Sequence, residues 1–256
     1  MAKDFLTETL HLTKTNWGTA RILDYSGVEV PPNPGHPRVE VTAEKVQDAP
    51  LRFRGKRVTV LNFASGVNPG GGVRYGAVAQ EEDLCRCSGL LHGLESLPEF
   101  FEMNRNRDAP PECYDRMIVS EDVPLVRDGE GNLIPTMPIQ VITYPAPNLF
   151  CGIFGEAPPD PDFFPEGHDG DIKPSDVKHI FDRRCPHILH QASALETDVL
   201  ILGAWGCGAY GNDPGLVAEA FKRALVFYGG GIPQVVFACY GASENRDTFH
   251  EVFNQS

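Results

Sequence analysis

The chain has 256 residues, 41% of them apolar, and a formal net charge of −13. Its length allows one sizeable core, and we expect one domain over residues 1–256, with residues 1–50 as an N-terminal extension. The negative charge argues against a surface that holds nucleic-acid phosphates through clustered Lys and Arg, so we expect no direct nucleic-acid binding. The sequence also contains no run of about eighteen apolar residues that could span a membrane, so we expect a soluble, cytoplasmic protein.

Helical and extended patterns alternate along the chain. Apolar spacing predicts a helix near residues 4–17, and the Pro- and Val-rich stretch 25–50 predicts irregular or edge structure. Almost continuously apolar runs, typical of strands covered on both faces, occupy residues 57–65, 138–145, 197–206 and 233–241. Helical patterns occupy residues 81–97, 174–194 and 214–228. This order predicts an α/β fold with a mixed, largely parallel sheet sandwiched by helices, after an N-terminal helical extension.

One long segment interrupts the alternation. Residues 152–175 are dense in Pro, Gly and Asp and have no periodicity, so we expect a loop. Its aromatic pairs either cover a ligand or fold onto the domain.

A glycine-rich loop follows the first apolar run. The three consecutive glycines at 70–72 let backbone amides approach a diphosphate or a sugar, because no Cβ stands in the way. A tight turn is the alternative interpretation. Seven residues further on, Gln80, Glu81 and Glu82 open a helix, where acidic residues also interact favourably with the helix dipole. The conjunction of the two features indicates a site more strongly than either feature alone.

A second glycine-rich turn joins the apolar run at 197–206 to the helix at 214–228. Asn212 or Asp213 is the expected N-cap of this helix, with Pro214 just inside it. On physical grounds the turn is either a second phosphate cradle or an ordinary strand-to-helix turn.

Together these motifs resemble those of the bacterial-type (microbial) poly(ADP-ribose) glycohydrolases, in which Gln-Glu-Glu follows a triple glycine at a short distance. The resemblance spans residues 59–238. It implies a macrodomain-like fold that binds ADP-ribose between two loops. It also implies hydrolysis of ribose–ribose O-glycosidic bonds, with poly(ADP-ribose) or ADP-ribosylated proteins as substrate, ADP-ribose as product, and no cofactor.

The resemblance assigns roles to individual residues. Glu82 matches the catalytic glutamate, and Glu81 matches the glutamate that orients the ribose whose bond is cleaved. Asn68 lies where macrodomains supply an amide to the distal ribose, with Asn62 as its competitor. Tyr210 stands where many relatives have Phe, so its hydroxyl either reaches solvent or crowds the site. The other expected substrate contacts are Gly70, Gly71, Gly72, Gln80, Gly206, Cys207, Gly208, Ala209 and Gly211.

The adjacency of the two glutamates shapes the expected mechanism. Glycosidases ordinarily place two carboxyl groups on either side of the bond, which adjacent residues cannot easily do. We therefore expect Glu82 to protonate the leaving 2′-hydroxyl and then to accept a proton from the attacking water. Nearby carboxylates would raise the pKa of Glu82 and the helix N-terminus would lower it. The acidic surface favours release of ADP-ribose mainly from chain ends.

Three other functions fit parts of the sequence. A macrodomain that only binds ADP-ribose needs the loops but not the acid, and a mono-ADP-ribosyl hydrolase acting on a protein or nucleic acid would look similar. A metal site is disfavoured, because neither of the two Cys/His sets on predicted helices has zinc-type spacing. These sets are Cys85, Cys87 and His92, and Cys185, His187 and His190. The seven scattered cysteines favour free thiols in a reducing compartment.

Overall fold

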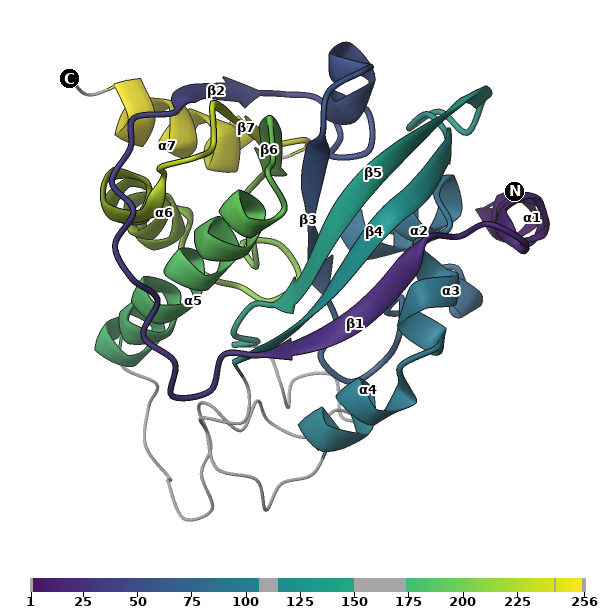
Figure 1. The fold of residues 1–256 in the computed structure, drawn as a ribbon, viewed down its shortest axis with the longest axis horizontal. Helices are drawn as coiled ribbons and strands as arrows, with labels where there is room; N and C mark the ends of the chain where they lie inside the picture. Colours follow the sequence, from purple (N-terminus) through teal and green to yellow (C-terminus); the bar gives the residue numbers. More distant parts are fainter. Residues whose placement is uncertain (1, 106–114, 150–173, 242, 255–256) are drawn as a thin grey trace.

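The computed structural model describes residues 2–105, 115–149, 174–241 and 243–254. At its centre lies a seven-stranded sheet in the order β1-β4-β5-β3-β6-β7-β2 (Figure 1). From β5 to β2 all neighbours are parallel, whereas β4 and β1 pair antiparallel at the other edge. The strands are β1 (Thr19–Asp24), β2 (Arg38–Thr42), β3 (Val58–Ala64), β4 (Arg116–Arg127), β5 (Leu133–Pro145), β6 (Val199–Leu202) and β7 (Gln234–Ala238). The predicted mixed, largely parallel sheet is confirmed.

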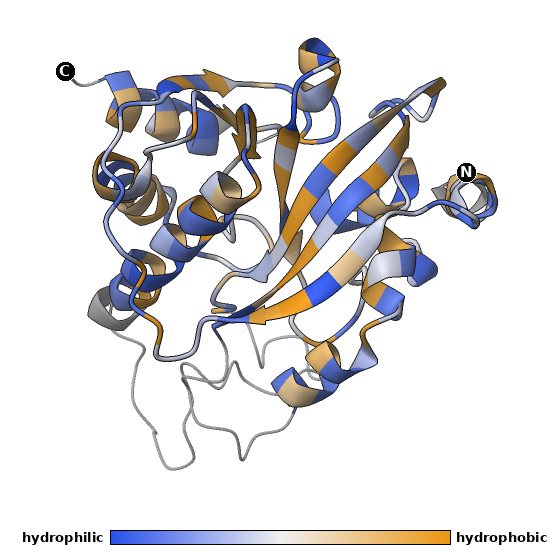
Figure 2. Ribbon diagram, in the orientation of Figure 1, coloured by the Kyte–Doolittle hydropathy of each residue, from blue (hydrophilic) through white to orange (hydrophobic). Residues whose placement is uncertain are grey.

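Helices cover both faces of this sheet (Figure 1). One face carries α1 (Ala2–Thr13), α2 (Gln80–Cys87), α3 (Leu90–Glu95) and α4 (Pro98–Arg105), together with the 3-10 turns η1 (Ala49–Phe53) and η2 (Val73–Tyr75). The other face carries α5 (Pro174–Ala194), α6 (Pro214–Tyr228) and α7 (Ser243–Asn254). Figure 2 shows apolar residues concentrated along the strands. Each face therefore has its own apolar core, one around Trp205 and Phe221 and the other around Leu84 and Phe100.

Local sequence explains the elements that position the site. β3 is buried along nearly its whole length, as its apolar run predicts. The α6 helix begins at Pro214, and the Asp213 side chain accepts a hydrogen bond from Leu216 N at 2.7 Å. Asp213, and not Asn212, is therefore the N-cap.

At several places tertiary contacts make the secondary structure differ from what the sequence pattern predicts. The predicted helix 81–97 is two helices, because Ser88 adopts an extended conformation and bridges to Leu125, while Gly89 N donates to Pro124 O at 3.0 Å. The run predicted as a strand over 197–206 is regular only in β6.

Residues 1–50, the predicted N-terminal extension, supply both edges of the sheet. β1 pairs with β4, and β2 pairs with β7. The edge structure expected within 25–50 is therefore β2, whereas β1, β4 and α7 were not predicted. The expected loop at 152–175 lies outside the described residues up to position 173, and its last two residues begin α5. In the part of the chain that is described, no helix has the length and apolar character needed to cross a membrane. The cytoplasmic location stays a prediction.

Candidate active site

A cavity of about 570 Å³ lies at the carboxyl ends of the parallel strands β3, β5, β6 and β7. Its volume is within the range of cavities that bind small molecules, and its place is where open α/β sheets bind ligands. Most of the predicted site residues line it. They are Asn68, Gly71, Gly72, Gln80, Glu81, Glu82, Gly206, Gly208, Ala209 and Tyr210.

The cavity opens where two parallel strands separate. β3 pairs with β6 only as far as Val60, and then continues to Ala64 beside β5. The Gln80 side chain takes the place of the missing strand: its Oε1 accepts from Phe63 N at 2.7 Å, and its Nε2 donates to Leu61 O at 3.1 Å. Gln80 thus fixes the start of α2 against β3. Its amide is bonded at both ends to backbone, and a contact with substrate stays a prediction.

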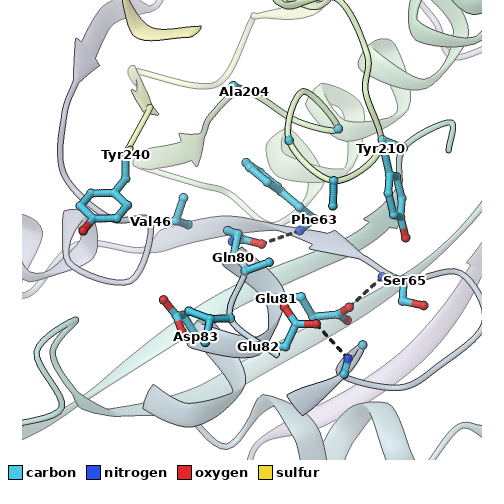
Figure 3. A pocket seen from close by; sticks show the side chains of 18 of the residues that line it. Val46, Phe63, Ser65, Gln80, Glu81, Glu82, Asp83, Ala204, Tyr210 and Tyr240 are labelled. Atoms are coloured by element: carbon cyan, nitrogen blue, oxygen red, sulfur yellow. Dashed lines mark hydrogen bonds between the residues drawn. The ribbon is translucent and has the colours of Figure 1, made fainter. Parts of the chain in front are cut away.

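Glu81 points from the first turn of α2 toward the end of β3 (Figure 3), and it is only 3% exposed. Its Oε1 accepts from Asn62 Nδ2 at 3.1 Å and its Oε2 from Ser65 N at 2.7 Å. Asn62 is fully buried and also donates to Thr143 Oγ1 at 3.3 Å. Asn62 therefore holds Glu81, whereas Asn68 is exposed and lines the cavity.

Burial changes the acidity of this glutamate. Desolvation raises the pKa of Glu81 from 4.5 to about 8, the charge of Glu82 adds to the rise, and the hydrogen bonds from Ser65 and Asn62 oppose it. Burial therefore favours the protonated form of Glu81. The sequence pointed to a pKa-raising effect only at Glu82.

Glu82 lies on the cavity wall, 8% exposed, and its Oε1 accepts from Gly72 N at 2.9 Å. Gly71 has a φ of +58°, and a Cβ at this position would lie 2.4 Å from Glu82 Oε1 and 3.1 Å from Glu81 Oε2. Both carboxyl groups thus converge beside Gly71, which must be glycine for its conformation and for space. The triple glycine shapes the carboxyl pair as well as the cavity.

The second loop, residues 206–211, forms the opposite wall. Gly206 has a φ of +76°, and a Cβ there would lie 2.6 Å from Ala146 Cβ. Asn212 Nδ2 donates to Gly206 O at 3.0 Å and to Pro147 O at 2.7 Å, which fixes the loop against the end of β5. Gly208 has open space around it, so the fold itself does not require a glycine there.

The Tyr210 hydroxyl donates to Ala64 O at 3.2 Å. It is therefore bound to the end of β3, a contact that the sequence did not suggest.

Three predicted contact residues lie off the cavity wall. A Cβ on Gly70 would lie 2.7 Å from Leu91 Cδ1, so this glycine serves packing against α3. The Cys207 thiol donates to Trp205 O at 3.7 Å, and burial raises its pKa well above its usual range. Gly211 has a φ of +72°, which favours glycine. The structure gives each of them a role in shaping a loop.

Both a protein family and several solved structures match this chain. Residues 8–128 match the family described as "Microbial-type PARG, catalytic domain". The chain is similar to the poly(ADP-ribose) glycohydrolase of Thermomonospora curvata, with a TM-score of 0.79, 29% identity, and coverage of 98% of this chain and 99% of that one. It is also similar to that of Deinococcus radiodurans in complex with ADP-ribose, with a TM-score of 0.75, 30% identity, and coverage of 95% and 96%. The chain belongs to the microbial-type poly(ADP-ribose) glycohydrolase family.

A second T. curvata poly(ADP-ribose) glycohydrolase structure, bound to the inhibitor ADP-HPD, matches with a TM-score of 0.78, 28% identity and coverage of 98% of each chain. No match was found among curated protein sequences. Most of the residues that carry the sequence resemblance to this family line one cavity.

The far end of the glycohydrolase cavity was missed by sequence reasoning. Val46 and Tyr240 lie at that end, and Tyr210 and Ser65 lie at the other (Figure 3). Tyr240 is 65% exposed, and Lys45 Nζ lies 5.2 Å from the centre of its ring. Tyr240 lies two residues after the end of β7 at Ala238, and that position near the carboxyl end of a strand is the signal that could have found it.

The two Cys/His sets pack within the glycohydrolase fold. His92 Nε2 is 3.0 Å from Leu10 O, and the His187 ring stacks on Tyr25 with centroids 4.6 Å apart. Burial lowers the pKa of His187 to about 4. Among the residues that the structure describes, no three metal-ligating side chains gather. The described cysteines, all free thiols, are Cys85, Cys87, Cys185, Cys207 and Cys239.

Proposed function

We propose that the chain hydrolyses the ribose–ribose O-glycosidic bonds of poly(ADP-ribose), with Glu82 as general acid and base, and releases ADP-ribose. The observation that carries this proposal is the convergence of the Glu81 and Glu82 carboxyl groups beside Gly71 on the cavity wall. Support comes from family membership and from the relative solved with ADP-ribose. A protein that only binds ADP-ribose does not need such a carboxyl pair.

Backbone amides supply the attraction for the diphosphate. Of the described residues that line the cavity, Lys45 alone is cationic, against the carboxyl groups of Glu81, Glu82 and Asp83. The N-terminus of α2 lines the cavity and concentrates partial positive charge there, and the glycine-rich loop 206–211 adds backbone N–H groups on the opposite wall. The diphosphate therefore lies between the loops 70–72 and 206–211, with the adenine at the Val46–Tyr240 end and the scissile ribose at Glu82.

The reaction then needs one proton delivered and one removed. Glu82 donates its proton to the 2′-oxygen of the leaving unit as the bond from C1″ to that oxygen breaks. The neighbouring diphosphate stabilises the positive charge that develops on the ribose. A water molecule attacks C1″ and gives its proton to the Glu82 carboxylate, which restores the acid. The Gly72 N–H holds Glu82 Oε1 through both steps.

Glu81 acts by position. Its ribose contacts keep C1″ beside Glu82. Because burial favours the protonated form of Glu81, the negative charge that forms on Glu82 in the first step is repelled less by this neighbour. Asn62 and Ser65 set the direction of its carboxyl group.

Digestion of poly(ADP-ribose) of defined length tests the reaction and its direction. We expect ADP-ribose as the main early product, since an acidic protein is a poor match for an anionic chain running across its surface. Early accumulation of mid-length oligomers would contradict release from chain ends. Binding of ADP-ribose without any release from polymer would point to a binding module, and release only from singly modified targets to a mono-ADP-ribosyl hydrolase.

A further inference from the structure

We propose that the Tyr210 hydroxyl is a positioning group for Glu81 and acts on it through the peptide that joins Ala64 to Ser65. Tyr210 Oη donates to the carbonyl oxygen of this peptide at 3.2 Å, and the N–H of the same peptide donates to Glu81 Oε2 at 2.7 Å. The proposal rests on the proposed function and adds a residue to it.

The backbone geometry at the end of β3 makes this link possible. The C=O and N–H of a trans peptide point in opposite directions, so one strand end can be bonded on both edges. Here the hydroxyl approaches from the β6–α6 loop and the carboxyl group from α2, with the strand end between them (Figure 3). Two elements far apart in sequence are thereby coupled through one rigid planar unit.

The link affects the carboxyl group in two ways. A hydrogen bond to a carbonyl polarises its peptide and strengthens the N–H donor on the other side. A stronger donor favours the ionised form of Glu81 over its protonated form. The hydroxyl also restricts the strand end, and with it the position of Ser65 N and of Glu81 Oε2.

Several other groups face Glu81 in the structure. Its own helix presents Glu82, whose charge raises the pKa, and the Cys85 thiol, whose own pKa burial raises well above the usual range. The β3 strand presents Asn62, and the loop that follows presents the N–H groups of Ser65 and Gly70, all three as donors. The hydroxyl of Tyr210 works on one of these donors.

The ring and the hydroxyl of Tyr210 can be separated by mutation. The ring lines the cavity and packs against the apolar core, and Tyr210→Phe keeps both contacts. The change removes the bond to Ala64 O. We expect Tyr210→Phe to lower kcat several-fold, to leave ADP-ribose affinity within a few-fold, and to shift the apparent pKa near 8 upward in the pH profile of kcat/KM.

A double-mutant cycle provides the decisive comparison. Wild type, Tyr210→Phe, Glu81→Gln and the double variant are assayed on polymer from about pH 6 to about pH 9.5. The proposal expects Tyr210→Phe to have no further effect on kcat in the Glu81→Gln background. An equal loss in both backgrounds, or an unmoved pH profile, would overturn it. Tyr228→Phe, at the end of α6 and outside the cavity, is the matched control and should change neither activity nor profile.

A measurement that does not depend on turnover tests this inference independently of the proposed function. Carboxyl-carbon NMR of glutamate-labelled protein follows the titration of Glu81, identified by its loss in Glu81→Gln. The Glu81 pKa should rise in Tyr210→Phe relative to wild type. An unchanged pKa would contradict the inference even in an active enzyme, and a raised one would support it even if no polymer were hydrolysed.

Discussion

Gly71 and Glu82 approach so closely that a Cβ on Gly71 would lie 2.4 Å from Glu82 Oε1. Glu82 Oε1 also accepts a hydrogen bond from Gly72 N at 2.9 Å, so the carboxyl group cannot move away from Gly71 without losing this bond. The glycine therefore determines where the proposed acid lies.

Gly71→Ala should nearly abolish polymer hydrolysis, because the methyl group displaces Glu82 and the positive φ disfavours alanine. Gly76→Ala is the matched control, since Gly76 has a φ of +86° in the same loop but open space around it. Turnover and chemical denaturation of both variants separate backbone strain from displacement. Equal turnover in the two variants would show that the contact with Glu82 is unimportant.

Asn62 and Asn68 should behave differently when each is replaced by Ala. Asn62→Ala removes a buried donor of Glu81 and should cost about 1–3 kcal/mol of unfolding free energy, with a loss of turnover. Asn68→Ala should change stability by less than about 0.5 kcal/mol and weaken ADP-ribose binding, because its side chain is exposed on the cavity wall. Denaturation curves and calorimetric titration measure the two effects. The assignment fails if Asn62→Ala proves as stable as Asn68→Ala.

Gly208 offers a test of the diphosphate position. A Cβ there meets nothing within 4 Å in the protein, so Gly208→Ala should leave the melting temperature almost unchanged. ADP-ribose affinity should fall several-fold, because the methyl group would stand where we place the diphosphate. Calorimetric titration checks this, and undiminished affinity would place the diphosphate elsewhere.

The raised pKa of Glu81 has a consequence for stability. The folded protein keeps this proton up to about pH 8, whereas the unfolded chain releases it near pH 4.5. The unfolding free energy contributed by Glu81 should therefore fall as pH rises through this window, by at most about 1.4 kcal/mol per pH unit. Glu81→Gln should remove that slope.

The measurement is the difference between wild type and Glu81→Gln in denaturation at several pH values. His187, whose pKa is lowered to about 4, contributes an opposite slope at the acidic end, which is present in both proteins and cancels. A difference that does not change with pH would mean that Glu81 titrates in its ordinary range.

The sequence predicted those parts of the fold whose signals are local. β3 follows from its apolar run, and the start of α6 follows from Asp213 and Pro214. The break between α2 and α3 did not follow, because it depends on a bridge from Ser88 to a strand that the sequence did not reveal. The antiparallel strands β1 and β4 depend on partners that are far apart in the chain.

In the candidate site, too, the features with local sequence signals were predicted and the others were not. Glu81, Glu82 and the glycines were found because they follow one another at a recognisable spacing. The bond of Gln80 to β3, the burial of Glu81 and the place of Tyr240 arise only when distant segments meet. The pKa of a carboxyl group depends on its exposure to solvent and on its hydrogen-bond donors, and adjacent residues in the sequence determine neither of these.

The central claim, that Glu82 transfers the proton, is tested most directly by comparing Glu82→Gln with Glu81→Gln in polymer hydrolysis and ADP-ribose binding. Glutamine keeps the shape and the bond from Gly72 N, but it cannot protonate the leaving oxygen. Glu82→Gln should lower turnover by roughly a hundred-fold to ten-thousand-fold or more and keep affinity within a few-fold. Glu81→Gln should lower turnover and affinity together, because it disturbs ribose positioning. Near-normal turnover in Glu82→Gln would contradict the account.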